Sequence, residues 1–171
     1  RIALRAAIDD PSLSRSVALI GATAGLAALE ERAHRREADQ RLALRLRTDG
    51  PESFLDFWLG LDLFGGLTDE QQQRRERLDL WGSGVAETLL HRGTGSMEPL
   101  WDRLLEIQAR TLVVAGERDH KFTEIGERLS IAIGSNATLC AISDAGHACH
   151  LEAPALTADA IVRWIDTPQK A

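Results

Sequence analysis

The chain has few cysteines, no long apolar segment and no excess of positive charge. Its two cysteines, Cys140 and Cys149, are too few for a disulfide framework, and no apolar run approaches the length needed to cross a bilayer. Twenty-six acidic residues against twenty basic ones give a formal charge of −6, so the chain lacks the bulk positive field that nucleic-acid or anionic-membrane binding uses. We therefore expect a cytoplasmic protein that binds neither nucleic acid nor a membrane.

The residues that are present predict a folded core. The chain has 171 residues, of which 44% are hydrophobic and 27% charged, enough for a sizeable apolar interior. Residues 1–8 alternate arginine with apolar residues and predict a helix that Asp9-Asp10-Pro11 ends. Because this opening has neither an initiator Met nor the apolar core of a signal peptide, we expect that Arg1 is not the native start.

Three short apolar runs predict the strands of a buried parallel sheet. They span residues 17–20, 111–115 and 138–142, and each is followed by a loop that contains glycine. A helical pattern follows the second run and another follows the third, as a sheet covered on both faces requires. The two helices are expected to bury Ile125, Leu129, Ala132 and Ile133 in the first, and Leu156, Ala160, Ile161, Trp164 and Ile165 in the second, which begins at Pro154.

About ninety residues without a strand pattern separate the first two strands, which predicts an inserted helical cap. Four helices are expected over residues 26–47, 52–63, 69–80 and 84–92, with a capping box formed by Thr68 and Gln71. The breaks between them are Gly50-Pro51, Gly65-Gly66 and Gly82-Ser83-Gly84. The predicted organisation is a core over residues 1–21, a cap over 22–96, and a second part of the core over 97–171.

Asp119 and His147 are the candidate catalytic residues. Each follows the end of a predicted strand, and in an open parallel sheet ligands bind beyond the carboxyl ends of the strands. A carboxylate can hold the tautomer of an imidazole whose other nitrogen acts as a base. Alternatively, Asp119 caps the following helix and His147 is a partly buried loop residue. A metal site at His147-Ala148-Cys149-His150 is disfavoured because no second ligand cluster accompanies it.

The succession of strand, Gly116-Glu117-Arg118-Asp119, helix, strand and Gly146-His147 resembles the second half of an α/β-hydrolase. The continuation His120-Lys121-Phe122 and the placement of arginines resemble the 2-succinyl-6-hydroxy-2,4-cyclohexadiene-1-carboxylate synthase family of menaquinone biosynthesis. The resemblance implies an α/β fold with an inserted helical cap and a lyase that eliminates pyruvate from a polycarboxylate substrate without a cofactor. It also implies a Ser-His-Asp triad whose Ser lies upstream of Arg1, so the chain as given is expected to be inactive.

The same resemblance implies substrate-binding roles for Arg1, Arg35, Trp58 and Arg77. Arginine suits such a ligand because its planar, permanently charged fork grips a carboxylate with two parallel hydrogen bonds. Arg35 shares a predicted helix face with Ala38, Leu42 and Leu46 and is expected to point inward, whereas Arg32, Arg36 and Asp39 are expected to face solvent. Trp58 lies on a stripe with Phe54 and Leu61 on a helix whose other side carries Leu55, Leu59 and Leu63.

Simpler explanations exist for two of these residues. Without the resemblance, Arg77 would be interpreted as a solvated charge among Arg74, Arg75 and Glu76, and Trp58 as a packing residue. Two other functions are compatible with the sequence. One is a serine hydrolase of esters or carbon–carbon bonds on the same fold, and the other is a non-catalytic interaction domain.

Overall fold

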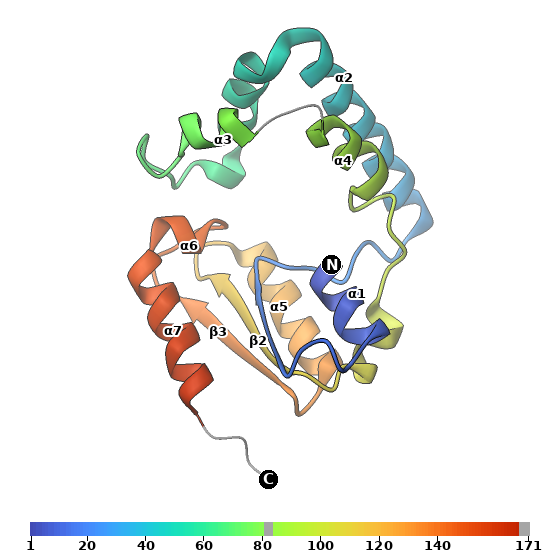
Figure 1. Cartoon of the computed structure of the whole chain (residues 1–171), viewed down its shortest axis with the longest axis vertical. Coiled ribbons are helices and arrows are strands. Elements are labelled where there is room, and N and C mark those ends of the chain that lie inside the picture. The colour runs from blue at the N-terminus through green and yellow to red at the C-terminus, as the bar shows by residue number, and fades with distance from the viewer. Residues whose placement is uncertain (81–83, 168–171) are drawn as a thin grey trace. The chain divides into compact units, whose positions relative to one another are not determined.

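The computed structural model describes residues 1–80 and 84–167, which divide into two compact units (Figure 1). The first unit comprises Arg1–Ala24 and Leu100–Ala171, and the second comprises Gly25–Pro99. Both boundaries fall three residues after the predicted ones.

The first unit is built on a three-stranded parallel sheet, as predicted. The strands β1 (Ser16–Ile20), β2 (Arg110–Gly116) and β3 (Ala137–Ile142) lie in the order β1-β2-β3, so β2 is the central strand. Val113 of β2 pairs with Leu19 on one side and Leu139 on the other. Six of the seven residues of β2 are buried, which explains why its sequence is a continuous apolar run.

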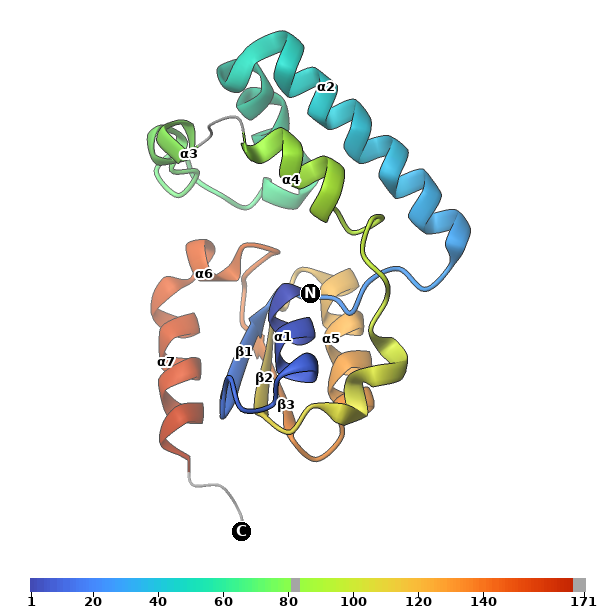
Figure 2. The same ribbon diagram turned by 45° about the vertical axis from the view of Figure 1, so that its right-hand side comes forward.

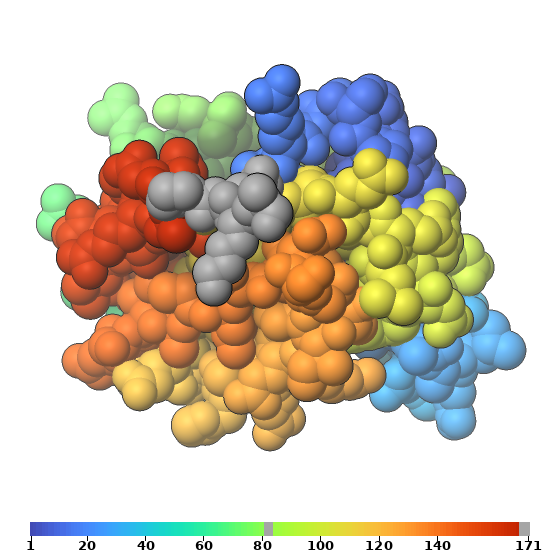
Figure 3. All heavy atoms as spheres, turned by 90° about the horizontal axis from the view of Figure 1, so that it is seen from below, coloured from blue at the N-terminus to red at the C-terminus, as the bar shows by residue number. Residues whose placement is uncertain are grey.

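Helices cover both faces of this sheet (Figure 2). On one face α1 (Ile2–Asp9), the 3₁₀ helix η2 (Trp101–Glu106) and α5 (His120–Ile133) pack around Val113. On the other face α7 (Pro154–Asp166), preceded by the short α6 (Cys149–Glu152), packs against Leu112 and Val114. In Figure 3, which looks at the amino ends of the strands, the segments that precede β1, β2 and β3 lie side by side.

The buried face of α7 differs from the predicted stripe. Trp164 is buried and Ala160 and Ile161 are partly buried, as predicted, but Leu156 and Ile165 are exposed and Thr157 is buried. The helix therefore contacts the sheet along positions 157, 160, 161 and 164, a stripe that begins at Thr157 rather than at Leu156. A threonine is stable there because its hydroxyl donates a hydrogen bond of 3.0 Å to the carbonyl of Cys149. The predicted face of α5 is confirmed, with Leu129 and Ile133 buried.

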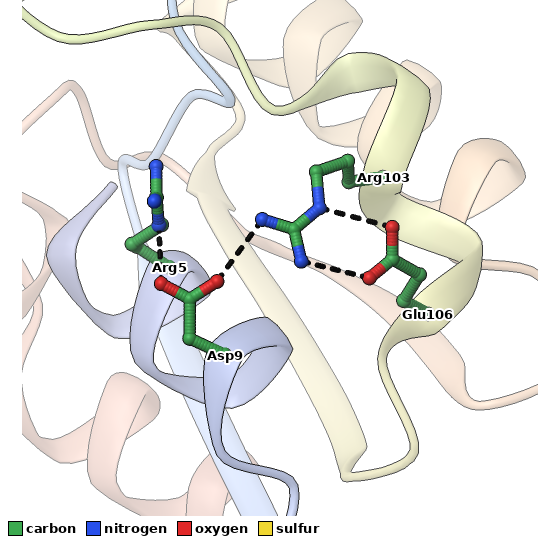
Figure 4. Close-up of polar contacts among 4 residues, drawn as sticks. All are labelled: Arg5, Asp9, Arg103 and Glu106. Carbon is green, nitrogen blue, oxygen red and sulfur yellow. Dashed lines mark hydrogen bonds and ion pairs between the residues drawn. The ribbon is translucent and has the colours of Figure 1, made fainter.

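A surface ion network joins α1 to η2 (Figure 4). Arg103 donates to Asp9 at 3.0 Å and grips Glu106 with two hydrogen bonds of 3.0 and 2.8 Å, and Arg5 also contacts Asp9. Hydrogen bonds from Arg5 and Arg103 lower the pKa of Asp9, and those from Arg103 lower the pKa of Glu106. The network couples two segments that are more than ninety residues apart in the sequence.

We predict that this network stabilises the fold at neutral pH and ceases to do so in acid. Because both carboxyl pKa values are lowered in the folded state, its contribution is complete above the ordinary carboxyl pKa of about 4 and disappears as the pH falls through the lowered values. In urea titrations, Arg103→Met should unfold at a lower urea concentration than the wild type at pH 7, and this difference should vanish in acid. The exposed pair of Arg163 and Asp159 provides the control, since Arg163→Met should change the midpoint little at either pH.

The second unit is helical, and the predicted break at Gly50-Pro51 is present. It lies within α2 (Leu29–Leu59), where Gly50 has a non-helical backbone with φ of 81°, so this element consists of two helices that meet at a kink. Proline is tolerated after this kink because it begins a new helical turn. The second predicted helix ends at Leu59 rather than at residue 63, and a 3₁₀ helix, η1 (Asp62–Phe64), follows. Leu63 is consequently exposed and does not belong to an apolar helix face.

The remaining cap helices are α3 (Arg74–Leu80) and α4 (Gly84–Arg92). The predicted capping box is present, since the amide of Thr68 donates to the side chain of Gln71 at 3.0 Å and the amide of Gln71 donates to the Thr68 hydroxyl at 3.3 Å. It closes a turn rather than a helix start, because Gln73 has φ of 49° and helix α3 begins after it. Residues 82 and 83 of the predicted break at Gly82-Ser83-Gly84 lie outside the described residues. In the described ranges, no helix is both long and apolar enough to span a membrane.

Candidate active site

Asp119 and His147 lie in contact at the carboxyl end of the sheet. Asp119 follows β2, His147 follows β3, and Oδ2 of Asp119 lies 2.7 Å from Nδ1 of His147. Both side chains are largely buried, with 11% of Asp119 and 21% of His147 exposed. The sequence-based expectation that adjacent strand ends bring these residues together is met, because β2 and β3 are neighbouring parallel strands.

Asp119 also caps helix α5. Its Oδ1 accepts a hydrogen bond of 3.2 Å from the amide of Phe122, while Oδ2 faces the imidazole. The two interpretations of Asp119, helix cap and histidine partner, are therefore both correct. The ring of Phe122 lies edge-on to the imidazole of His147 with centroids 4.4 Å apart. The cap thus fixes the carboxylate and, through Phe122, one side of the ring it pairs with.

This geometry favours one tautomer of His147. A carboxylate accepts hydrogen bonds, so the short contact requires the proton of the neutral ring to be on Nδ1, and Nε2 then carries the lone pair. Such an imidazole can take a proton through Nε2, and the carboxylate stabilises the cation that forms. The pair therefore has the geometry that a general base requires, with an orientation that the fold determines.

The residues before Asp119 hold the loop that carries His147. A side chain on Gly116 would clash with the backbone of Ala145 and Gly146, so only glycine permits this approach. The amides of Glu117 and Arg118 donate to the carbonyls of Ile142 and Ala145, both at 2.9 Å. The Glu117 carboxylate accepts from the amide of Asp144 at 3.3 Å, where Asp144 has a left-handed backbone with φ of 56°.

Gly21 is a site residue that the sequence analysis did not identify. It ends β1 with φ of +54°, and a Cβ at this position would lie 3.2 Å from Cε1 and 3.6 Å from Nδ1 of His147. The backbone of Gly21 therefore forms a wall against the edge of the imidazole between its two nitrogens. Its position directly after a predicted strand, like that of Gly116, was the only signal available in the sequence.

Trp58 and Arg77 belong to one aromatic cluster in the second unit. Trp58 stacks on Phe54 with centroids 5.9 Å apart, and it also contacts Phe64 at 5.9 Å. The guanidinium of Arg77 lies over the same Phe64 ring at 5.9 Å, and its Nε donates to the carbonyl of Gln72 at 2.8 Å. Two of the predicted substrate-binding residues are thus brought together, and Arg77 is not merely a solvated charge.

The prediction that Arg35 lies on the buried stripe of its helix is wrong. The side chain of Arg35 is 43% exposed, and its Nε donates a hydrogen bond of 2.8 Å to Asp39, which is 1% exposed. The buried face of α2 instead carries Arg32, Asp39 and Ala43. Arg32 donates from Nη1 to the carbonyls of residues 26 and 27, at 3.0 and 2.9 Å.

The loop after α4 explains why a different face of α2 is buried from the predicted one. Gly95 lies so close to the backbone of α2 that a side chain there would clash with Arg32 and Arg36, and Gly93 is equally close to Asp39. Arg36 donates to the Gly95 carbonyl at 2.9 Å. The Arg92-Gly93-Thr94-Gly95 stretch therefore covers the side of α2 that was predicted to face solvent, and Arg35 faces away from it with its guanidinium tethered by the buried Asp39.

Arg1, the fourth predicted substrate-binding residue, stands immediately before α1, in the same unit as Asp119 and His147, and its carbonyl accepts from the amide of Arg5 at 2.8 Å.

Neither a metal nor a thiol nucleophile is favoured. Among the described residues, no three side chains of His, Cys, Asp or Glu are grouped as a metal ion requires. Burial raises the pKa of the Cys149 thiol, so Cys149 stays protonated at neutral pH and is a poor nucleophile.

Known proteins resemble this chain in sequence and in structure. No family model matches the chain. Relatives from Bacillus subtilis and Escherichia coli are 33% and 32% identical over 161 residues, 91% of this chain, and the E. coli protein is a 2-succinyl-6-hydroxy-2,4-cyclohexadiene-1-carboxylate synthase. The solved structure of MenH from S. aureus matches 96% of this chain with a TM-score of 0.91 and 32% identity.

The match covers only part of each relative. The chain spans 58% and 60% of the lengths of the B. subtilis and E. coli proteins and 64% of the S. aureus chain. An alpha/beta hydrolase enzyme from a deep-sea metagenome shares the fold at 17% identity, with a TM-score of 0.64 over 99% of this chain and 62% of its own. The three-stranded sheet with its helices therefore has the α/β-hydrolase fold.

Proposed function

We propose that this chain, which has the α/β-hydrolase fold and is homologous to 2-succinyl-6-hydroxy-2,4-cyclohexadiene-1-carboxylate synthases, carries the acid and the base of such a synthase. The proposed enzyme is a lyase of menaquinone biosynthesis that eliminates pyruvate from a 2-succinyl-5-enolpyruvyl-6-hydroxy-cyclohexene-carboxylate. One observation carries the proposal, the 2.7 Å contact between Asp119 and His147 at the carboxyl end of the sheet. The function of the relatives supports the choice of reaction.

In the proposed reaction, Nε2 of His147 acts as the base that starts the elimination. A proton leaves the substrate ring, its electron pair forms a new carbon–carbon double bond, and the carbon–oxygen bond to the enolpyruvyl group breaks. The enolate of pyruvate leaves and takes up a proton at its methylene carbon to become pyruvate, which balances the proton that His147 removes. Asp119 stabilises the imidazolium during this step, and general base catalysis of this kind contributes about 10²–10⁴ in rate. A serine outside these 171 residues is proposed to complete the triad and relay the proton.

The proposed role of Arg1, Arg35 and Arg77 is to bind the carboxylates of the substrate, and that of Trp58 is to contact the substrate. Of these, Arg35 is best prepared for binding, because the bond to Asp39 uses only its Nε and the guanidinium carries four further N–H donors on its terminal nitrogens. The half-exposed position keeps those donors within reach of a ligand. The bond to the buried carboxylate of Asp39 limits the side-chain conformations of Arg35, so less conformational entropy is lost on binding.

The experiment is an assay of pyruvate release by the protein expressed from the whole reading frame that contains these residues. We expect turnover of the polycarboxylate substrate and its loss in His147→Ala. A simple aryl ester serves as the second substrate, because a serine hydrolase of esters would cleave it faster than it turns over the polycarboxylate. No activity on either substrate would support the non-catalytic interaction domain and contradict the proposal.

Replacing Arg35 by alanine should raise KM for the polycarboxylate by at least about tenfold with a much smaller change in kcat. This is the effect of losing a charge-assisted hydrogen bond that is formed equally in the ground state and the transition state. Arg41→Ala is the matched control, since Arg41 is exposed on the same helix. An unchanged KM in the Arg35 variant would remove Arg35 from the proposed site.

A further inference from the structure

A buried carboxylate links the residue before the catalytic acid to the residue before the catalytic base. Glu152, at the end of α6, has a side chain that is only 5% exposed. Its Oε2 accepts a hydrogen bond of 2.7 Å from the amide of Gly146 and one of 3.0 Å from Arg118. Gly146 precedes His147, and Arg118 precedes Asp119. One oxygen atom of Glu152 is therefore hydrogen-bonded to the neighbour of each residue of the pair.

The arrangement permits little adjustment. A Cβ on Gly146 would lie 2.8 and 3.0 Å from the two carboxylate oxygens of Glu152, so a side chain at this position would displace that carboxylate. Arg118 is also paired with Asp144 at 3.4 Å, and its own amide donates to the carbonyl of Ala145. Removing one partner of a buried carboxylate is costly, because the charge is then left without compensation. The loop from Asp144 to His147 is therefore held at both ends by groups that converge on Arg118 and Glu152.

We propose that Glu152 is a positioning residue for His147. Its carboxylate fixes the backbone at Gly146 and, through Arg118, the turn that presents Asp119, and thereby sets the distance and angle of the contact between Asp119 and His147. Glu152 does not touch the reacting atoms and acts through the imidazole. The inference rests on the proposed function, in which that imidazole is the base.

The state of the imidazole is measurable without turnover. With ¹⁵N-labelled histidine at pH 8, the wild type should show His147 as the Nδ1–H tautomer, with a slowly exchanging Nδ1 proton. The resonance is assigned by its loss in His147→Gln. In Glu152→Ala the two ring nitrogens should move toward the averaged shifts of a free imidazole, and the Nδ1 proton should exchange with solvent about tenfold faster, as expected when the bond to Asp119 is loosened.

Two further variants keep the test decisive. Arg118→Met removes the second hydrogen-bond partner of the Glu152 carboxylate and should produce the same spectral change. Because Arg118 is half-exposed, this variant serves as the test if Glu152→Ala fails to fold. Glu127→Ala, an exposed acid on α5, should leave the spectrum unchanged. An unchanged His147 spectrum in folded Glu152→Ala or Arg118→Met, alongside an altered one in Asp119→Asn, would overturn the inference while the proposed function stands. A wild type without the Nδ1–H tautomer would instead remove the basis of the proposed function.

Discussion

Replacing Asp119 by asparagine is expected to lower kcat for pyruvate release by about 10⁴-fold while leaving the fold in place. The substitution preserves the shape of the side chain but replaces the Oδ2 that faces Nδ1 of His147 by an amide. An amide NH₂ donates, so the imidazole must accept at Nδ1 and carry its proton on Nε2. The nitrogen that is proposed to act as the base is then already protonated, and no cationic form is stabilised.

The stability of the Asp119→Asn variant should change little. Asparagine is as good a helix N-cap as aspartate, so its carbonyl can still accept from the amide of Phe122 at the start of α5. A loss of kcat without a loss of stability would therefore be an effect on the chemistry and not on folding. The measurement is kcat together with a thermal unfolding curve, and the matched control is Asp159→Asn, an exposed residue on α7. A loss of less than tenfold in a normally folded variant would show that the carboxylate does not set the state of the base.

The sequence predicts the sheet and the Asp119–His147 pair because both depend on one local pattern. An apolar run that ends at glycine predicts a buried strand, and consecutive strands of a parallel sheet deliver the residues that follow them to the same edge. Nothing beyond the order of the strands is needed to place the two side chains together. The contact between Asp119 and His147 was therefore predictable. The hydrogen bond from the Phe122 amide to Asp119 follows from the position of Asp119 at the start of α5.

Features that depend on long-range packing were not predictable in the same way. The periodicity of α2 suggested Ala38, Leu42 and Leu46 as the buried stripe, but the glycines of the loop after α4 bring that loop against the face with Arg32 and Asp39. Likewise, Thr157 rather than Leu156 is buried in α7 because the carbonyl of Cys149 offers it a partner. In both places a polar residue is buried by a contact that no local pattern in the sequence shows.

The role of Gly21 also lies in a long-range contact, and its substitution gives the second large effect. Gly21→Ala should lower kcat by about 10²-fold, because the new methyl group would stand 3.2 Å from Cε1 of His147 and force the imidazole to move. The ring cannot yield freely, since Phe122 packs against it at 4.4 Å and Asp119 holds its Nδ1. The expected displacement opens the contact with Asp119 or misdirects Nε2.

Gly21→Ala also carries a backbone cost that must be separated from this effect. An alanine at φ of +54° is destabilised by roughly 1–2 kcal/mol whatever surrounds it. Gly134→Ala is the matched control, because Gly134 has φ of +85°, follows the far end of α5 and has only Leu105 at 3.9 Å from the added methyl group. Gly134→Ala should lose at least as much stability in thermal unfolding, because its ψ of −143° lies near a region that is essentially restricted to glycine, whereas only Gly21→Ala should lose activity. Equal activity in the two variants would show that the wall formed by Gly21 does not position the base.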